Sequence, residues 1–115
     1  AIAMAEAGAD AIITHVGTTV GGSIGVVDAT ISLDDAARRT QEIIEAARTV
    51  RDDVIYLCHG GPINTPDDAA YVLEHTDAVG FVGASSLERM AVEESLTALT
   101  REFKSIPVKR MPPRA

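Results

Sequence analysis

The chain has 115 residues, a formal net charge of −7, 46% hydrophobic residues and only 3% aromatic residues. This length allows at most one domain, and its core must be built mainly from Ala, Val, Ile and Leu. Nucleic-acid binding needs a basic stripe to displace counterions from phosphates, and no such stripe is visible in this acidic chain. No apolar stretch approaches the roughly 18 residues of a membrane span. We therefore expect neither a nucleic-acid nor a membrane partner. The single cysteine, Cys58, excludes an intrachain disulfide and fits a cytoplasmic location.

Three short β-branched segments alternate with longer amphipathic ones along the chain. The predicted strands are residues 11–16, 54–58 and 78–82. Each is short and apolar on both sides, as in a strand that is covered on both faces. Strands separated by single helices imply a parallel sheet with right-handed crossovers.

The predicted helices have recognisable starts. Ser32 and Thr65 are suitable N-caps, and Thr65 is followed by Pro66 at the first helical position. Ser85 with Glu88 has the spacing of a capping box at the start of the last helix. A stripe of apolar residues along that helix predicts its buried face: Val92, Leu96, Leu99 and Phe103.

The resulting α-βα-βα-βα order leaves two architectures open, an open doubly wound sheet and part of a (β/α)8 barrel. The chain begins in what reads as the last turns of a helix, so we expect it to be the C-terminal portion of a longer protein. Residues 1–106 form the predicted domain, and residues 107–115 a flexible C-terminal tail.

In both architectures ligands bind beyond the carboxyl ends of the strands. Two glycine-rich loops lie there, at residues 59–61 and 83–86. Glycine lets backbone N–H groups approach an anion, and a helix N-terminus adds further donors. Alternatively, these residues only form tight turns. The predicted phosphate-binding residues are Gly60, Gly61, Gly83, Ala84, Ser85 and Ser86. Arg89, one turn later, could contact an anion, although an exposed helix face is its ordinary interpretation.

His15 and His59 both stand at strand ends and are the predicted catalytic residues. Each could act as a general acid or base near neutral pH, or donate a hydrogen bond to an anion. The alternative is a histidine bonded to backbone at the rim of the fold. Cys58 should point to the opposite side from His59 and serve as a core thiol. Two histidines without a third ligand do not predict a metal site.

A further glycine-rich loop follows the first strand and includes Gly21, Gly22 and Ser23. Its glycine spacing does not fit the dinucleotide-binding fingerprint, and no lysine completes a phosphate-binding P-loop. We interpret it as a possible loop over the site, with an ordinary surface loop as the alternative.

Three segments together resemble the phosphoenolpyruvate hydrolase-like TIM-barrel family: residues 14–25 (THVGTTVGGSIG), 57–63 (LCHGGPI) and 80–89 (GFVGASSLER). The resemblance extends over about residues 1–106. It implies a (β/α)8 barrel of which this chain holds about strands six to eight. It also implies hydrolysis of a phosphoenolpyruvate- or phosphonopyruvate-like oxoacid with Mg²⁺ held by acidic residues of earlier strands. No such acidic cluster lies at a strand end here, so the resemblance assigns no metal ligand in this chain.

Three functional hypotheses remain open. The first is a hydrolase that binds a small anionic substrate or metabolite. The second is a non-catalytic metabolite-binding or regulatory, signal-transducing barrel. The third is a gene fragment without activity of its own. For the full-length protein we expect a homo-oligomer.

Overall fold

The computed structural model describes residues 1–22, 27–28 and 31–107. Its centre is a parallel sheet in the order β1-β2-β3, formed by β1 (Ala11–His15), β2 (Ile55–His59) and β3 (Gly80–Phe81). In the register of the sheet His15 pairs with His59. The predicted mixed α/β fold with a parallel sheet is confirmed.

The third strand is shorter than the predicted range 78–82. Two further hydrogen bonds flank it, from Val79 N–H to the Tyr56 carbonyl and from Val82 N–H to the Cys58 carbonyl. The chain therefore follows β2 through this whole range, although only two residues adopt regular strand geometry. This pairing places the loop after Val82 at the same edge of the sheet as His15 and His59.

Two helices, α2 (Leu33–Arg48) and α3 (Pro66–Glu74), form a layer on the sheet, and the short helix α1 (Ile2–Glu6) contacts α2. The predicted N-caps of α2 and α3 are confirmed. The Ser32 side chain accepts the Asp35 N–H, and Thr65 forms a complete capping box with Asp68. These caps satisfy helix N–H groups that have no partner within the helix.

The core lies between this helical layer and one face of the sheet. Alternation along β1 buries Ile12 and Thr14, and the same face of β2 buries Tyr56 and Cys58. Side chains of the helices complete it: Ala36, Ala37, Ile44, Ala47, Ala69 and Val72. The opposite face of the sheet is open, since Ile13 and Ile55 are 49% and 52% exposed.

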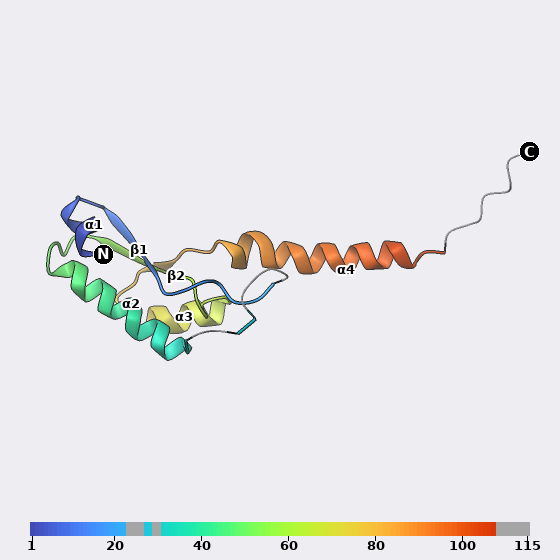
Figure 1. Ribbon diagram of the computed structural model, residues 1–115, viewed down its shortest axis with the longest axis horizontal. Coiled ribbons are helices and arrows are strands. Elements are labelled where there is room, and N and C mark those ends of the chain that lie inside the picture. The colour runs from blue at the N-terminus through green and yellow to red at the C-terminus, as the bar shows by residue number, and fades with distance from the viewer. Residues whose placement is uncertain (23–26, 29–30, 108–115) are drawn as a thin grey trace, which may run out of the picture.

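The last helical segment extends away from the sheet and from helices α1 to α3, which together form the body of the molecule. It begins as a π-helical turn, η1 (Ser85–Met90), and continues as α4 (Ala91–Ser105), which projects away from the sheet (Figure 1). The predicted capping box at Ser85 is wrong, because Ala84 precedes η1 and no side chain caps it. The predicted buried stripe is also wrong, because no other element of the described residues covers it and all four members are more than half exposed: Val92, Leu96, Leu99 and Phe103.

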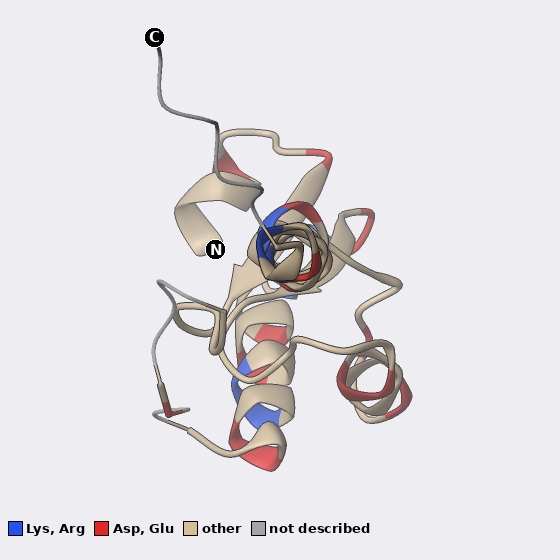
Figure 2. Ribbon diagram, turned by 90° about the vertical axis from the view of Figure 1, so that its right-hand side faces the viewer, with Lys and Arg blue, Asp and Glu red and all other residues tan. Residues whose placement is uncertain are grey.

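Both α2 and α4 carry charged residues of both signs (Figure 2). On α2, Arg38 pairs with Asp35 and Glu42. Within the described part of the chain, no helix is both long and apolar enough to cross a membrane. The predicted flexible tail falls almost entirely on residues 108–115, which lie outside the described residues.

Candidate functional site

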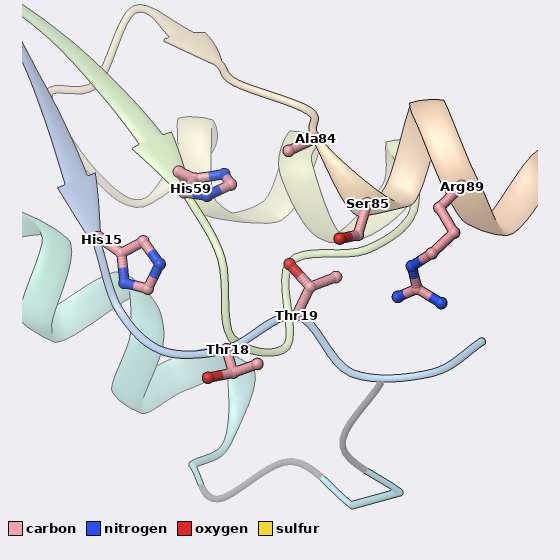
Figure 3. Close-up of a pocket in the computed structure, with 7 residues that line it drawn as sticks. All are labelled: His15, Thr18, Thr19, His59, Ala84, Ser85 and Arg89. Carbon is pink, nitrogen blue, oxygen red and sulfur yellow. The ribbon is translucent and has the colours of Figure 1, made fainter. Parts of the chain in front are cut away.

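A pocket of about 310 Å³ lies where the carboxyl ends of β1 and β2 meet the start of η1 (Figure 3). The sheet and the loops bring four of the predicted site residues to its wall, together with three that were not in the predicted set. The predicted members are His15, His59, Ala84 and Ser85. The additional members are Thr18, Thr19 and Arg89.

The two histidines form a pair because their strands are in register. Their ring centroids are 5.0 Å apart and the rings meet edge to face. His59 Nδ1 lies 2.7 Å from the Val82 carbonyl oxygen, to which it donates. A carbonyl can only accept, so this bond places the proton of the neutral imidazole on Nδ1 and leaves Nε2 as the acceptor. His59 can therefore offer a basic nitrogen to a ligand.

Gly60 and Gly61 shape the rim of the pocket and do not line it. Both have positive φ, and the Gly61 N–H donates to the Gly17 carbonyl oxygen at 2.7 Å. A Cβ on Gly60 would lie only 2.4 Å from that same oxygen. The glycines thus let the loops after β1 and β2 touch. The Gly61 amide is committed within the protein, and ligand contact from this pair stays a prediction.

The loop at residues 83–86 enters the pocket through Ala84 and Ser85 only. Gly83 lies behind them, where a Cβ would be 2.4 Å from Leu87 Cδ1, so the glycine permits Leu87 to fold back over the turn. Figure 3 shows the Ser85 hydroxyl turned toward Thr19. The role of these residues, Ser86 included, as anion ligands stays a prediction.

The segment that carries Thr18 and Thr19 is fixed at several points. Val20 N–H donates to the Gly61 carbonyl at 3.3 Å, and Asn64 Nδ2 donates to the Val20 carbonyl at 2.7 Å. The two threonines are therefore held at one wall of the pocket. Thr18 and Thr19 lie in an irregular loop, where no periodic pattern in the sequence indicates a functional position.

The glycine-rich loop predicted to cover the site reaches the helix after β3. Gly21 and Gly22 have positive φ and lie against Met90 and Arg89. Ser23 lies outside the described residues. Neither Gly21 nor Gly22 lines the pocket itself, and a role of this loop as a cover of the site stays a prediction.

Arg89 is the cationic residue of the pocket. Its guanidinium pairs with Glu93 at 3.3 Å, and its side chain is 21% exposed. It stands four positions after Ser85, and the helical turn of η1 brings both side chains to the same pocket. That four-residue spacing was the available signal in the sequence.

The wall of the pocket is rich in hydrogen-bond donors. None of the seven described residues that line it is acidic, although the chain as a whole carries −7. Cys58 faces the core, as predicted, and burial raises the pKa of its thiol, which disfavours a nucleophilic thiolate. Among the described residues no three His, Cys, Asp or Glu side chains are grouped to hold a metal ion.

A parallel α/β unit with a polar pocket beyond the carboxyl ends of its strands defines a class of ligand-binding and enzyme domains. Residues 1–106 match the family described as phosphoenolpyruvate hydrolase-like, and the chain belongs to this family. The resemblance seen in the three loops is thereby confirmed.

Named relatives come from a plant and a bacterium. The chain is 51% identical over 107 residues to the ToMV susceptible protein tm-1(GCR26) and to the ToMV resistance protein Tm-1(GCR237), both of Solanum lycopersicum. It is 34% identical over 102 residues to the putative transcriptional regulatory protein y4pA of Sinorhizobium fredii. The matches cover 92%, 92% and 89% of this chain but only 14%, 14% and 17% of these relatives.

Proposed function

We propose that this chain is the C-terminal portion of a (β/α)8 barrel, about strands six to eight, whose pocket binds a small phosphorylated or carboxylated ligand. We further propose hydrolysis of a phosphoenolpyruvate- or phosphonopyruvate-like oxoacid as its reaction. The observation that carries the binding proposal is the donor-rich, carboxylate-free wall formed by the two histidines, Ser85 and Arg89.

The position of the helices favours a barrel over an open doubly wound sheet. The helices α2 and α3 pack against the face of β1 and β2 whose side chains are buried, whereas a doubly wound sheet carries helices on both faces. The other face exposes Ile13 and Ile55. In a barrel that face points inward and is covered by the remaining strands.

An anion fits the pocket better than a cation or a neutral apolar ligand does. Arginine is a preferred partner of phosphate and carboxylate groups, and hydroxyl groups add donors around it. A pocket lined by an arginine and by no carboxylate contrasts with the net charge of −7 of the chain as a whole. Cytoplasmic location, a homo-oligomeric full-length protein and the absence of nucleic-acid and membrane partners belong to the same proposal.

His59 is the residue best placed for proton transfer. Its Nδ1–H is held by Val82, so Nε2, which no described residue engages in a hydrogen bond, can take a proton from an attacking water and return it to a leaving group. The Mg²⁺ expected from the resemblance does not fit the described residues, because no carboxylate lines the pocket. We therefore derive no step through a metal.

The test compares His59→Asn with the unchanged chain. Asparagine retains an N–H near the position of Nδ1, so it can still bind the Val82 carbonyl, but it has no counterpart of Nε2. We expect phosphate release from phosphoenolpyruvate to fall about 10²–10⁴-fold while binding of inorganic phosphate persists. Equal turnover by both proteins would contradict the role of His59. Absence of phosphate and phosphoenolpyruvate binding by the unchanged chain would contradict the proposed function as a whole.

A second candidate function is binding without catalysis. One relative is named a putative transcriptional regulatory protein and two are named for susceptibility or resistance to ToMV, and none of these names states a reaction. This candidate predicts that phosphoenolpyruvate raises the melting temperature of the chain without being turned over.

A further inference from the structure

Arg89 connects the loop after β1 to the helix that carries Arg89 itself. One Nη donates to the Gly21 carbonyl oxygen at 3.5 Å, and the other lies 3.3 Å from both carboxylate oxygens of Glu93. Gly22 lies so close to the guanidinium that a Cβ there would approach Nη1 to 2.3 Å. Arg89 is thus packed between the loop after β1 and its own helix.

These contacts leave part of the guanidinium available. Arginine carries five N–H donors in a planar fork. Glu93 and Gly21 engage the two Nη groups through long bonds, and the side chain still lines the pocket beside Ser85. Donors therefore remain for a ligand on the pocket side, while Glu93 offsets part of the positive charge.

We infer that Arg89 is the residue that selects the anionic group of the ligand, that its bond to Gly21 positions the Thr18–Thr19 wall, and that Glu93 lowers its affinity for anions. This inference rests on the proposed function and assigns the anion-recognising and tuning residues of that same site. His59 and Arg89 then have different roles in the pocket: His59 transfers protons, and Arg89 binds the anionic group of the ligand. Figure 3 shows the two side chains at opposite ends of the pocket, with Ser85 and Thr19 between them.

The alternative is that Arg89 only ties the loop to the helix. Both roles predict that the loop loosens when Arg89 is replaced, so loop mobility alone does not separate them. They differ in what Glu93 does. If Arg89 binds the anion, neutralising Glu93 should raise the affinity of the pocket for that anion. If the Arg89–Glu93 pair is purely structural, neutralising Glu93 should leave this affinity unchanged.

The experiment titrates the full chain with inorganic phosphate at low ionic strength and measures affinity by calorimetry. NMR shifts of His15, His59, Gly21 and Gly22 locate the binding and the loop. The variants are Arg89→Gln, Arg89→Lys, Glu93→Gln and, as a matched control, Glu94→Gln. Glu94 is the adjacent, exposed carboxylate of the same helix and does not line the pocket.

We expect Arg89→Gln to weaken phosphate binding about tenfold or more, as loss of a charge-assisted bond does. Arg89→Lys should fall between, because an ammonium keeps the charge but not the fork. Glu93→Gln should tighten binding roughly two- to fivefold, and Glu94→Gln should leave it unchanged. The Glu93 variant retains Arg89, so the inference can still be tested if Arg89→Gln fails to fold.

Two results would overturn the inference while leaving the proposed function in place. One is phosphate binding at the histidines with unchanged affinity in Arg89→Gln. The other is equal affinity of Glu93→Gln and Glu94→Gln. If the unchanged chain shows neither calorimetric binding nor shifts at His15 and His59, the proposed function fails, and the inference fails with it.

Discussion

The body of the molecule and its projecting helix carry the same kind of sequence pattern with opposite results. In α2, apolar residues at helical spacing are buried against the sheet, and Ile44 and Ala47 are fully enclosed. In α4, Val92, Leu96 and Leu99 follow a similar spacing and remain in solvent. An amphipathic pattern therefore specifies a helix and the face it offers, but not whether another element covers that face.

The largest contrast is expected from truncating one side chain in each region. Ile44→Ala should cost about 2–5 kcal/mol of the free energy of unfolding, because it leaves a cavity in a packed core. Leu96→Ala, at a side chain that is 62% exposed, should cost about 0.5 kcal/mol or less. Urea unfolding of both variants measures this. Comparable losses would mean that α4 is packed in solution, and the contrast between the two regions would disappear.

Much of the body could be predicted from local chemistry. The caps at Ser32 and Thr65 follow from side-chain oxygens that satisfy N–H groups, and the direction of Cys58 follows from the two-residue period of a strand. The approach of His15 to His59 follows from the parallel order, since equivalent strand ends meet at one edge. These features depend on near neighbours in the sequence or on the order of strands alone.

The projecting helix and part of the site could not be predicted in this way. The π-helical turn of η1 departs from the 3.6-residue period, and the α-helical start with a cap at Ser85 that the sequence predicts does not form. Thr19 reaches the pocket because Asn64 and Gly61 hold its loop, contacts that span more than 40 positions. Irregular loops held by distant residues leave no periodic signal in the sequence.

A smaller effect should separate the two kinds of glycine in the body. Gly60 and Gly8 have nearly the same positive φ, 82° and 86°. A Cβ at Gly60 would collide with the Gly17 carbonyl, whereas a Cβ at Gly8 would meet nothing within 4 Å. Gly8→Ala should therefore cost only the backbone strain, about 1 kcal/mol, and Gly60→Ala roughly 1–3 kcal/mol.

Denaturant unfolding of the two alanine variants tests this difference, and phosphate titration extends it to the pocket. Because the Gly60 loop also positions His59 and the wall of the pocket, Gly60→Ala should weaken phosphate binding while Gly8→Ala should not. If Gly60→Ala is as mild as Gly8→Ala, the two loops are not in contact in solution.

The smallest expected effect concerns the start of α3, a cap of a kind that η1 lacks. Burial raises the pKa of the Asp68 carboxyl. Hydrogen bonds donated by the Thr65 N–H, the Thr65 hydroxyl and the Asn64 N–H together lower this pKa by more than burial raises it, so it lies below the ordinary value. A carboxyl with a lowered pKa stabilises the folded state above its unfolded pKa of about 4. This stabilisation is lost as the pH falls through the lower, folded-state pKa.

Asp68→Asn should therefore cost a few tenths to about 1 kcal/mol at neutral pH and progressively less below about pH 4. Asp67→Asn is the matched control, because Asp67 lies in the same first turn while all three bonds go to Asp68. Unfolding free energies of both variants between pH 7 and pH 3 measure the difference. A loss in Asp68→Asn that stays constant over this range would mean that the charge contributes nothing and that only the shape of the capping box matters. The cap of α3 would then differ from the uncapped start of η1 in geometry and not in electrostatics.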